Sequence, residues 1–260
     1  QLGKLGIMGM NLPERFGGAG ISAPALLASV AAIAGACGST ASLVTAHFLA
    51  TDSILLAGDA AQRQRYLPAA AAGKMLGAFG LTEPRAGSNP ADLRTRATRT
   101  AQGYRLEGVK HFISNGATAD FIIVYAITDP TAGHRGISAF VVDRKTDGLT
   151  AGPPEKTMGL KGGHVFELSF DCCVPAENRL GPEGSGFKTA MRVLDNGRIE
   201  AAAARWPITK EFSGCLPTWR PNWRRRDCWR MTPRRYEKRV SVSPSRPRWQ
   251  NSSPLKWRPR

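Results

Sequence analysis

The first 204 residues contain no tryptophan, and the segment between Phe16 and Thr51 contains no aspartate, glutamate, lysine or arginine. A charge-free stretch of this length raises the question of a membrane span, which needs about 20 strongly apolar residues. Here alanine, glycine, serine and threonine dominate, and Gly35, Gly38 and Ser39 interrupt the run. The composition therefore favours helices buried in a protein core, and we expect no membrane partner.

Cysteine is scarce and unpaired. The chain has five cysteines, none in a Cys-x-x-Cys spacing, and its four histidines form no shared cluster. Thiolate metal sites and disulfide frameworks use cysteines in pairs at short spacings. We therefore expect no bound metal, and incidental thiols are typical of a protein in the reducing cytoplasm.

Positive charge is concentrated at one end of the chain. Residues 205–260 carry 16 lysines and arginines against 3 acidic residues, a net charge of +13 out of +16 for the whole sequence. All six tryptophans and eight of the 18 prolines also lie there. Such a segment has little capacity to form a core, so two different kinds of sequence meet near Ala204.

Helical patterns fill the opening third of the chain. Alanine- and leucine-rich runs predict helices over residues 22–38 and 40–58. Asp59 is placed to cap a third helix that extends to about Ala72. We therefore expect an N-terminal α-helical domain over residues 1–76.

Short runs rich in β-branched and aromatic residues follow, separated by glycine and proline. Their spacing predicts a small antiparallel β-barrel in a middle domain over residues 77–186. The expected strands cover residues 78–81, 97–100, 104–106, 110–114, 121–128, 137–143 and 165–170. A helical pattern returns over residues 187–204, as the first helix of a C-terminal domain, so the expected fold class is α+β.

Four segments within this framework are specific when taken together. They are NLPERFGG at 11–18, LTEPRAGS at 81–88, KHFISNG at 110–116 and GPEGSGF at 181–187. In this order and spacing they closely resemble the acyl-CoA dehydrogenase family, flavoproteins that introduce an α,β double bond into an acyl thioester. The resemblance covers residues 1–204 and is greatest to short-chain and branched-chain members, which implies a role in fatty acid or branched-chain amino acid catabolism.

The resemblance also implies positions for an FAD cofactor and an acyl-CoA substrate. The residues that match the family's flavin-lining segments are Phe79, Leu81, Thr82, Ser88, Phe112, Ile113 and Ser114. Ser88 would also face the CoA side, and Asp195 and Arg198 match a pair that lies along the CoA chain. Without the resemblance, the hydroxyl residues are ordinary turn formers and Asp195–Arg198 is a local i,i+3 ion pair.

Abstraction of the α proton needs a positioned carboxylate. In most of the family this glutamate lies further along the C-terminal domain, and in some members it immediately precedes the arginine, where this chain has Gly197. Glu200 is about one helical turn further on and is a poor substitute. We therefore predict no catalytic residue within the matching region and an impaired dehydrogenase.

The resemblance implies two protein partners. Reduced flavin would pass electrons to an electron-transfer flavoprotein, and family members assemble as homotetramers through their C-terminal bundle. Because no bundle pattern follows Ala204, we expect a truncated C-terminal domain, doubtful oligomerisation and weak FAD retention.

Residues 205–260 allow two interpretations. At face value, arginine runs interleaved with tryptophan are typical of segments that bind nucleic acid or anionic membranes, and the chain would be a non-catalytic binding protein. Alternatively, the back-translated codons of 205–229, read two bases later, can spell LADHEGIQWLLADLATELEAARLL, and those of 248–256 can spell MAKLFASE. Both strings resemble C-terminal helices of the same family, so we expect an out-of-frame tail and no specific nucleic-acid partner.

Overall fold

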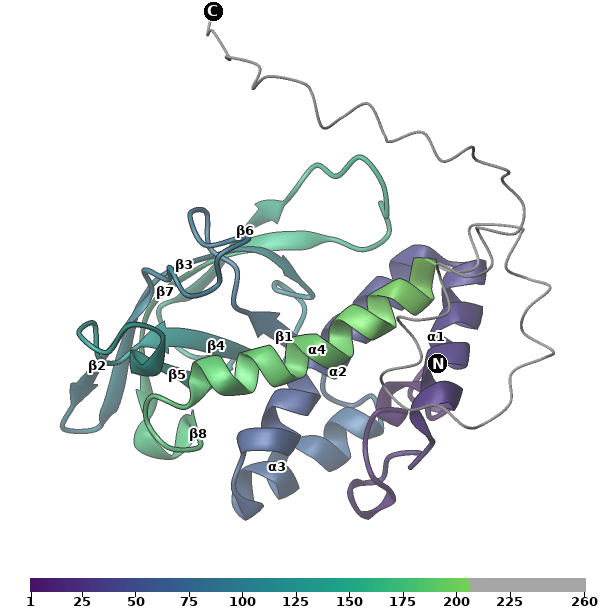
Figure 1. Cartoon of the computed structure of the whole chain (residues 1–260), viewed down its shortest axis with the longest axis horizontal. Helices are drawn as coiled ribbons and strands as arrows, with labels where there is room; N and C mark the ends of the chain where they lie inside the picture. The colour runs from purple at the N-terminus through teal and green to yellow at the C-terminus, as the bar shows by residue number, and fades with distance from the viewer. Residues whose placement is uncertain (206–260) are drawn as a thin grey trace, which may run out of the picture. The chain divides into compact units, whose positions relative to one another are not determined.

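The computed structural model describes residues 1–205 (Figure 1). Both interpretations of the basic tail therefore concern residues that lie outside the described part of the chain, apart from the backbone of Arg205. The described residues fall within one compact unit. The division into segments 1–76, 77–186 and 187–204 stays a prediction.

Three helices form the N-terminal part, as expected from the sequence. They are α1 (Ala23–Ala36), α2 (Gly38–Ala57) and α3 (Ala60–Ala71). Asp59 Oδ1 accepts from the Gln62 backbone N–H at 2.8 Å, and Gln62 Oε1 accepts from the Asp59 backbone N–H at 2.9 Å. This reciprocal capping box confirms the predicted start of α3.

Helix α2 packs against α1, α3, α4 and strand β1. By length and composition it is the one helix in the described part that is apolar enough to cross a membrane, and half of its most apolar window is buried inside the protein. Val44, Phe48 and Ile54 are all at most 2% exposed. The helix therefore packs as a core helix, as its alanine- and serine-rich composition predicts.

Eight strands form one mixed sheet. They are β1 (Gly77–Gly80), β2 (Arg96–Thr100), β3 (Gly103–Ser114), β4 (Phe121–Ile127), β5 (Ile137–Asp143), β6 (Leu149–Pro154), β7 (Val165–Pro175) and β8 (Arg179–Leu180). The order along the sheet is β6-β7-β3-β2-β4-β5-β8, and β1 pairs with β4. The sequence prediction missed β6 and β8, and it divided β3 into two strands.

The predicted β-domain is confirmed, but its sheet differs from a closed antiparallel barrel in two respects. Strand β1 pairs parallel with β4 over four residue pairs, and β2 meets β4 in parallel at Arg96 and Ile127. Among the described residues, no pairing joins the end strands β6 and β8, so a closed barrel is not formed. The sheet is instead curled, because one core cluster combines side chains of β4 and β5 with those of β3, β6 and β7.

Strand β4 is buried on both faces, and its alternation separates two cores. Phe121, Ile123 and Tyr125 pack with residues of α2, α3 and α4. The intervening side chains pack inside the curled sheet. Tyr125 also shares a hydrogen bond with Ser53 of α2 at 3.1 Å. The strand therefore fixes the sheet to the helices, and this contact shapes the candidate site.

Helix α4 (Gly186–Arg205) confirms the helix expected after residue 186. It crosses from the sheet to the N-terminal helices (Figure 1) and contacts α1, α2 and β5. Ala190 and Val193 are fully buried on its inner face. The helix thereby forms one side of a cleft whose opposite side is the sheet.

Candidate functional site

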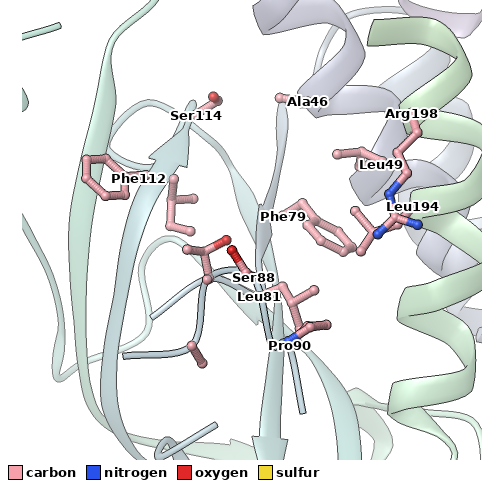
Figure 2. Close-up of a pocket in the computed structure, with 14 residues that line it drawn as sticks. Ala46, Leu49, Phe79, Leu81, Ser88, Pro90, Phe112, Ser114, Leu194 and Arg198 are labelled. Atoms are coloured by element: carbon pink, nitrogen blue, oxygen red, sulfur yellow. The ribbon is translucent and has the colours of Figure 1, made fainter. Parts of the chain in front are cut away.

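A cleft of about 370 Å³ lies between the edge of the sheet and helices α2 and α4. It is lined by all seven residues that the sequence predicted to surround a flavin: Phe79, Leu81, Thr82, Ser88, Phe112, Ile113 and Ser114. Leu49, Leu194 and Arg198 lie on the helical side (Figure 2). Folding therefore brings two sequence motifs, separated by more than 20 residues, into one site with the last helix.

The two motifs are joined by a buried ion pair. Lys110 Nζ lies 2.7 Å from Glu83 Oε1, and the two side chains are 0% and 3% exposed. Lys110 Nζ also donates to the Leu81 carbonyl at 3.3 Å. Burial lowers the pKa of Lys110, and Glu83 opposes this effect. Burial alone would raise the pKa of Glu83, but the Lys110 charge and the hydrogen bonds to the carboxylate lower it on balance.

Strand β3 has a bulge at the site. Lys110 pairs with Leu168 and Ile113 with Phe166, so two residues of β3 oppose one of β7 in a bulge. Within it, the His111 backbone N–H donates to the Thr82 carbonyl at 2.9 Å. The bulge therefore turns this edge of β3 away from β7 and onto the loop that carries Thr82.

Phe112 occupies the strained position of this bulge. Its φ of 57° lies in the left-handed region, which is uncommon for a large side chain. The ring is 57% exposed and stacks on His111, with 4.1 Å between ring centroids. Strain combined with an exposed aromatic ring at a cleft is typical of a ligand-binding position.

Three residues that line the cleft have hydroxyl groups with no hydrogen-bond partner among the described residues. No hydrogen bond between described residues uses the side-chain oxygens of Thr82, Ser88 or Ser114, whereas Phe79, Leu81 and Ile113 supply apolar surface beside them. This combination fits a flavin, whose flat ring has apolar faces and an edge of hydrogen-bonding atoms. The hydroxyl donors and apolar side chains of the cleft are therefore chemically suited to FAD, the cofactor that the sequence implies.

Asp195 and Arg198 form an ion pair, but they line two different hollows on the surface. Its closest N–O distance is 3.7 Å, and the side chains are 57% and 66% exposed. Arg198 lines the cleft, whereas Asp195 lines a neighbouring groove beside Lys188 and Arg192. The local ion pair is therefore present, but it is too exposed to contribute more than a few tenths of a kcal/mol.

Glu200 lies away from the cleft. Its side chain is 3% exposed and is not among the residues that line the site. Burial, followed by the negative charge of Asp52 on α2, raises its pKa to about 8. Burial also raises the pKa of Asp52 to about 6, against the hydrogen bond from Asn11. Glu200 therefore belongs to a buried carboxylate pair between two helices and does not face the predicted flavin site.

Gly197, in contrast, faces the helical wall of the cleft. A Cβ atom at this position would lie 2.4 Å from Cδ2 of Leu49, which lines the cleft. Because that atom is the end of a flexible side chain, a larger residue could be accommodated by a rotamer change. Arg85, within the motif at 81–88, is exposed and does not line the cleft.

Several lining residues were missed from the sequence. Ala46 and Leu49 of α2, together with Leu194 of α4, form the apolar side of the cleft. The spacing of Ala46 and Leu49 is typical of one helix face, but it does not show what that face contacts. The Glu83–Lys110 pair was also missed, because the two residues are 27 positions apart and no local pattern joins them.

Two family models match the described part of the chain. Residues 1–74 match the acyl-CoA dehydrogenase N-terminal domain, and residues 78–173 match the acyl-CoA dehydrogenase middle domain. The chain belongs to the acyl-CoA dehydrogenase family. This finding confirms the resemblance carried by the four motifs.

Individual proteins agree with the family models. An acyl-CoA dehydrogenase of Bacillus subtilis is 42% identical over 205 residues, which cover 78% of this chain and 54% of that protein. The structure of butyryl-CoA dehydrogenase from Megasphaera elsdenii superposes with a TM-score of 0.77 at 41% identity, covering 80% and 56% of the two chains. An acyl-CoA dehydrogenase complexed with FAD from Bacillus anthracis gives 0.74 at 35% identity, covering 79% and 35%. The chain spans about half the length of the curated relatives it matches.

Proposed function

We propose that this chain is the flavin-binding part of an FAD-dependent acyl-CoA dehydrogenase whose activity in this form is impaired. One observation carries the proposal: all seven motif residues converge on a single cleft that helix α4 covers from the opposite side. The bound flavin would supply the hydride-accepting ring, and the protein would supply position, polarity and exclusion of water.

The sheet wall is the part of the chain suited to hold the ring. Thr82 and Ser114 are half-buried and have free hydroxyl groups that can donate to polar atoms at the flavin edge. Neutral donors of this kind stabilise negative charge that develops on a bound ring. Phe79, Leu81 and the exposed Phe112 would offer apolar surface to the faces of the ring.

The helical wall is the part suited to the acyl-CoA. Leu49 and Leu194 offer apolar surface for an acyl chain, and Arg198 offers a positive charge beside it. We propose that Ser88, on the loop opposite, contacts either the flavin or the CoA chain. Asp195 lies in the adjoining groove, so we propose that the CoA chain extends from the cleft in that direction.

Impairment follows from the side chains around the cleft. Among the described residues, no aspartate or glutamate lines it, so no base is positioned for the α proton. The family relation supports electron-transfer flavoprotein as acceptor and a homotetramer as the assembled form, and we propose both. No feature of the described residues favours the alternative of a non-catalytic binding protein.

The proposal is tested by absorbance spectroscopy of the full chain. FAD is added, unbound flavin is removed by desalting, and butyryl-CoA is then added without oxygen. A retained flavin band that does not bleach supports a flavin site without its base. A colourless protein would refute flavin binding, and a band that bleaches rapidly would refute impairment.

A further inference from the structure

The loop of residues 84–93 brings Gly87, Ser88 and Pro90 to the cleft. One carboxylate ties its two ends together. Glu83, immediately before the loop, accepts from the backbone N–H of Arg94 at 2.6 Å and from that of Thr95 at 3.1 Å, immediately after it. The loop is therefore closed at its base by a side chain and not by a strand pair.

Lys110 fixes this closure to the sheet. Its ammonium group bonds the same carboxylate at 2.7 Å and the Leu81 carbonyl at 3.3 Å. The next residue, His111, donates from its backbone N–H to the Thr82 carbonyl. Gly108 permits the approach, since a Cβ atom there would lie 2.7 Å from the Thr95 Cα. The position of the loop relative to Phe112 and Ser114 is thus set by the buried pair together with the His111–Thr82 backbone hydrogen bond.

We propose that Glu83 and Lys110 form a positioning pair that closes loop 84–93 and thereby sets where Ser88 presents its hydroxyl group in the cleft. The inference rests on the proposed flavin and acyl-CoA site, but the closure itself is a property of the protein alone. Neither side chain lines the cleft, so the pair acts through Ser88 and Thr82. Buried ion pairs contribute little net stability when replaced by neutral groups of similar shape, so positioning and stability can be separated.

The test compares the full-length parent with the double variant Glu83→Gln, Lys110→Met. This change removes both buried charges together and leaves one amide oxygen for two N–H donors. Hydrogen–deuterium exchange without flavin should be faster by about tenfold or more in residues 86–92, while exchange in α2 stays within about twofold. In an FAD titration, the dissociation constant should rise by about tenfold or more because Ser88 and Thr82 are displaced.

Arg105→Gln is the matched control. Arg105 lies on the same strand and pairs with Asp171 on the surface, 2.9 Å apart, where the side chains are 49% and 70% exposed. Loop exchange and FAD affinity should both match the parent. Loop exchange that changes less than about twofold in the double variant would overturn the proposal.

Misfolding of the double variant and failure of the parent to bind FAD can each be separated from failure of the proposal. If the double variant does not fold, Glu83→Asp replaces it, because the shorter carboxylate retains the charge but cannot span both N–H groups and Lys110. Faster loop exchange in that variant supports the proposal, and unchanged exchange overturns it. If the parent itself binds no FAD, the proposed function fails, whereas the exchange experiment still decides whether the pair closes the loop.

Discussion

The two walls of the cleft are held in different ways. On the sheet wall, a buried ion pair, a backbone hydrogen bond between motifs and a bulge fix the predicted flavin-facing residues. On the helical wall, the lining side chains are apolar except for Arg198, whose ion pair with Asp195 is largely exposed. The difference indicates that the described residues hold the sheet wall, where we propose that flavin binds, more firmly than the helical wall, and no described aspartate or glutamate lines the cleft.

The largest effect should come from breaking the buried pair on the sheet wall. Lys110→Met alone leaves the Glu83 carboxylate buried without its counter-charge, so unfolding free energy should fall by about 3–5 kcal/mol. Urea denaturation followed by circular dichroism measures this loss. A loss below about 1 kcal/mol would show that water or another group replaces the lysine, and the rigid character of this wall would be disproved.

The second largest effect should come from adding a carboxylate to the helical wall. Gly197→Glu places an acidic group beside Leu49 at the cleft, where a base could reach a bound thioester. We expect anaerobic flavin bleaching by butyryl-CoA to accelerate by about 100-fold, the lower range for a positioned general base. Gly197→Gln is the control and should not bleach faster than the parent. Equal bleaching rates for the two variants would show that a carboxylate on the helical wall is not sufficient to restore proton abstraction.

The buried carboxylates behind the helical wall should make stability depend on pH. The pKa of Glu200 is raised from 4.5 to about 8 in the folded protein, so the folded state holds a proton that the unfolded state has released. Stability should therefore decrease as the pH rises from about 4.5 to about 8, and level off above that range.

Glu200→Gln removes this titration and should stabilise the protein at pH 8 by about 4 kcal/mol relative to the parent. Thermal unfolding at pH 5 and pH 8 measures the difference. Asp52→Asn provides a comparison, since it removes the facing charge and should flatten the same slope in part. If the stability of the parent does not depend on pH over this range, Glu200 is not buried in its protonated form.

The smallest effect should come from the exposed pair on α4. Asp195→Asn should change the free energy of unfolding by less than about 0.5 kcal/mol, because solvent screens both charges. The same urea series measures it. A loss comparable to that of Lys110→Met would remove the contrast between the two walls.

The sequence was sufficient for the features that depend on local patterns. The capped start at Asp59, the three N-terminal helices and α4 all follow from composition and periodicity. The seven cleft residues were identified through ordered motifs, and their convergence on one cleft agrees with that assignment. Whether each contacts flavin stays a prediction.

Features that depend on contacts between distant parts of the chain could not be predicted from local sequence patterns. Strand β6 contains Gly152 and two prolines, and β8 has two residues, so neither has a strand pattern. The parallel pairing of β1 with β4 is set by the core that both share. Glu200 is buried within range of the charge of Asp52, on a helix far earlier in the chain, and no local signal marks that proximity.

The most direct test of a flavin site on the sheet wall is an FAD titration of the full chain and of the double variant Thr82→Val, Ser114→Ala. We predict that the parent binds FAD and that the variant binds about tenfold more weakly, with an unchanged unfolding midpoint, because two hydrogen-bond donors are lost. Equal affinities, or no FAD binding by the parent, would contradict the account.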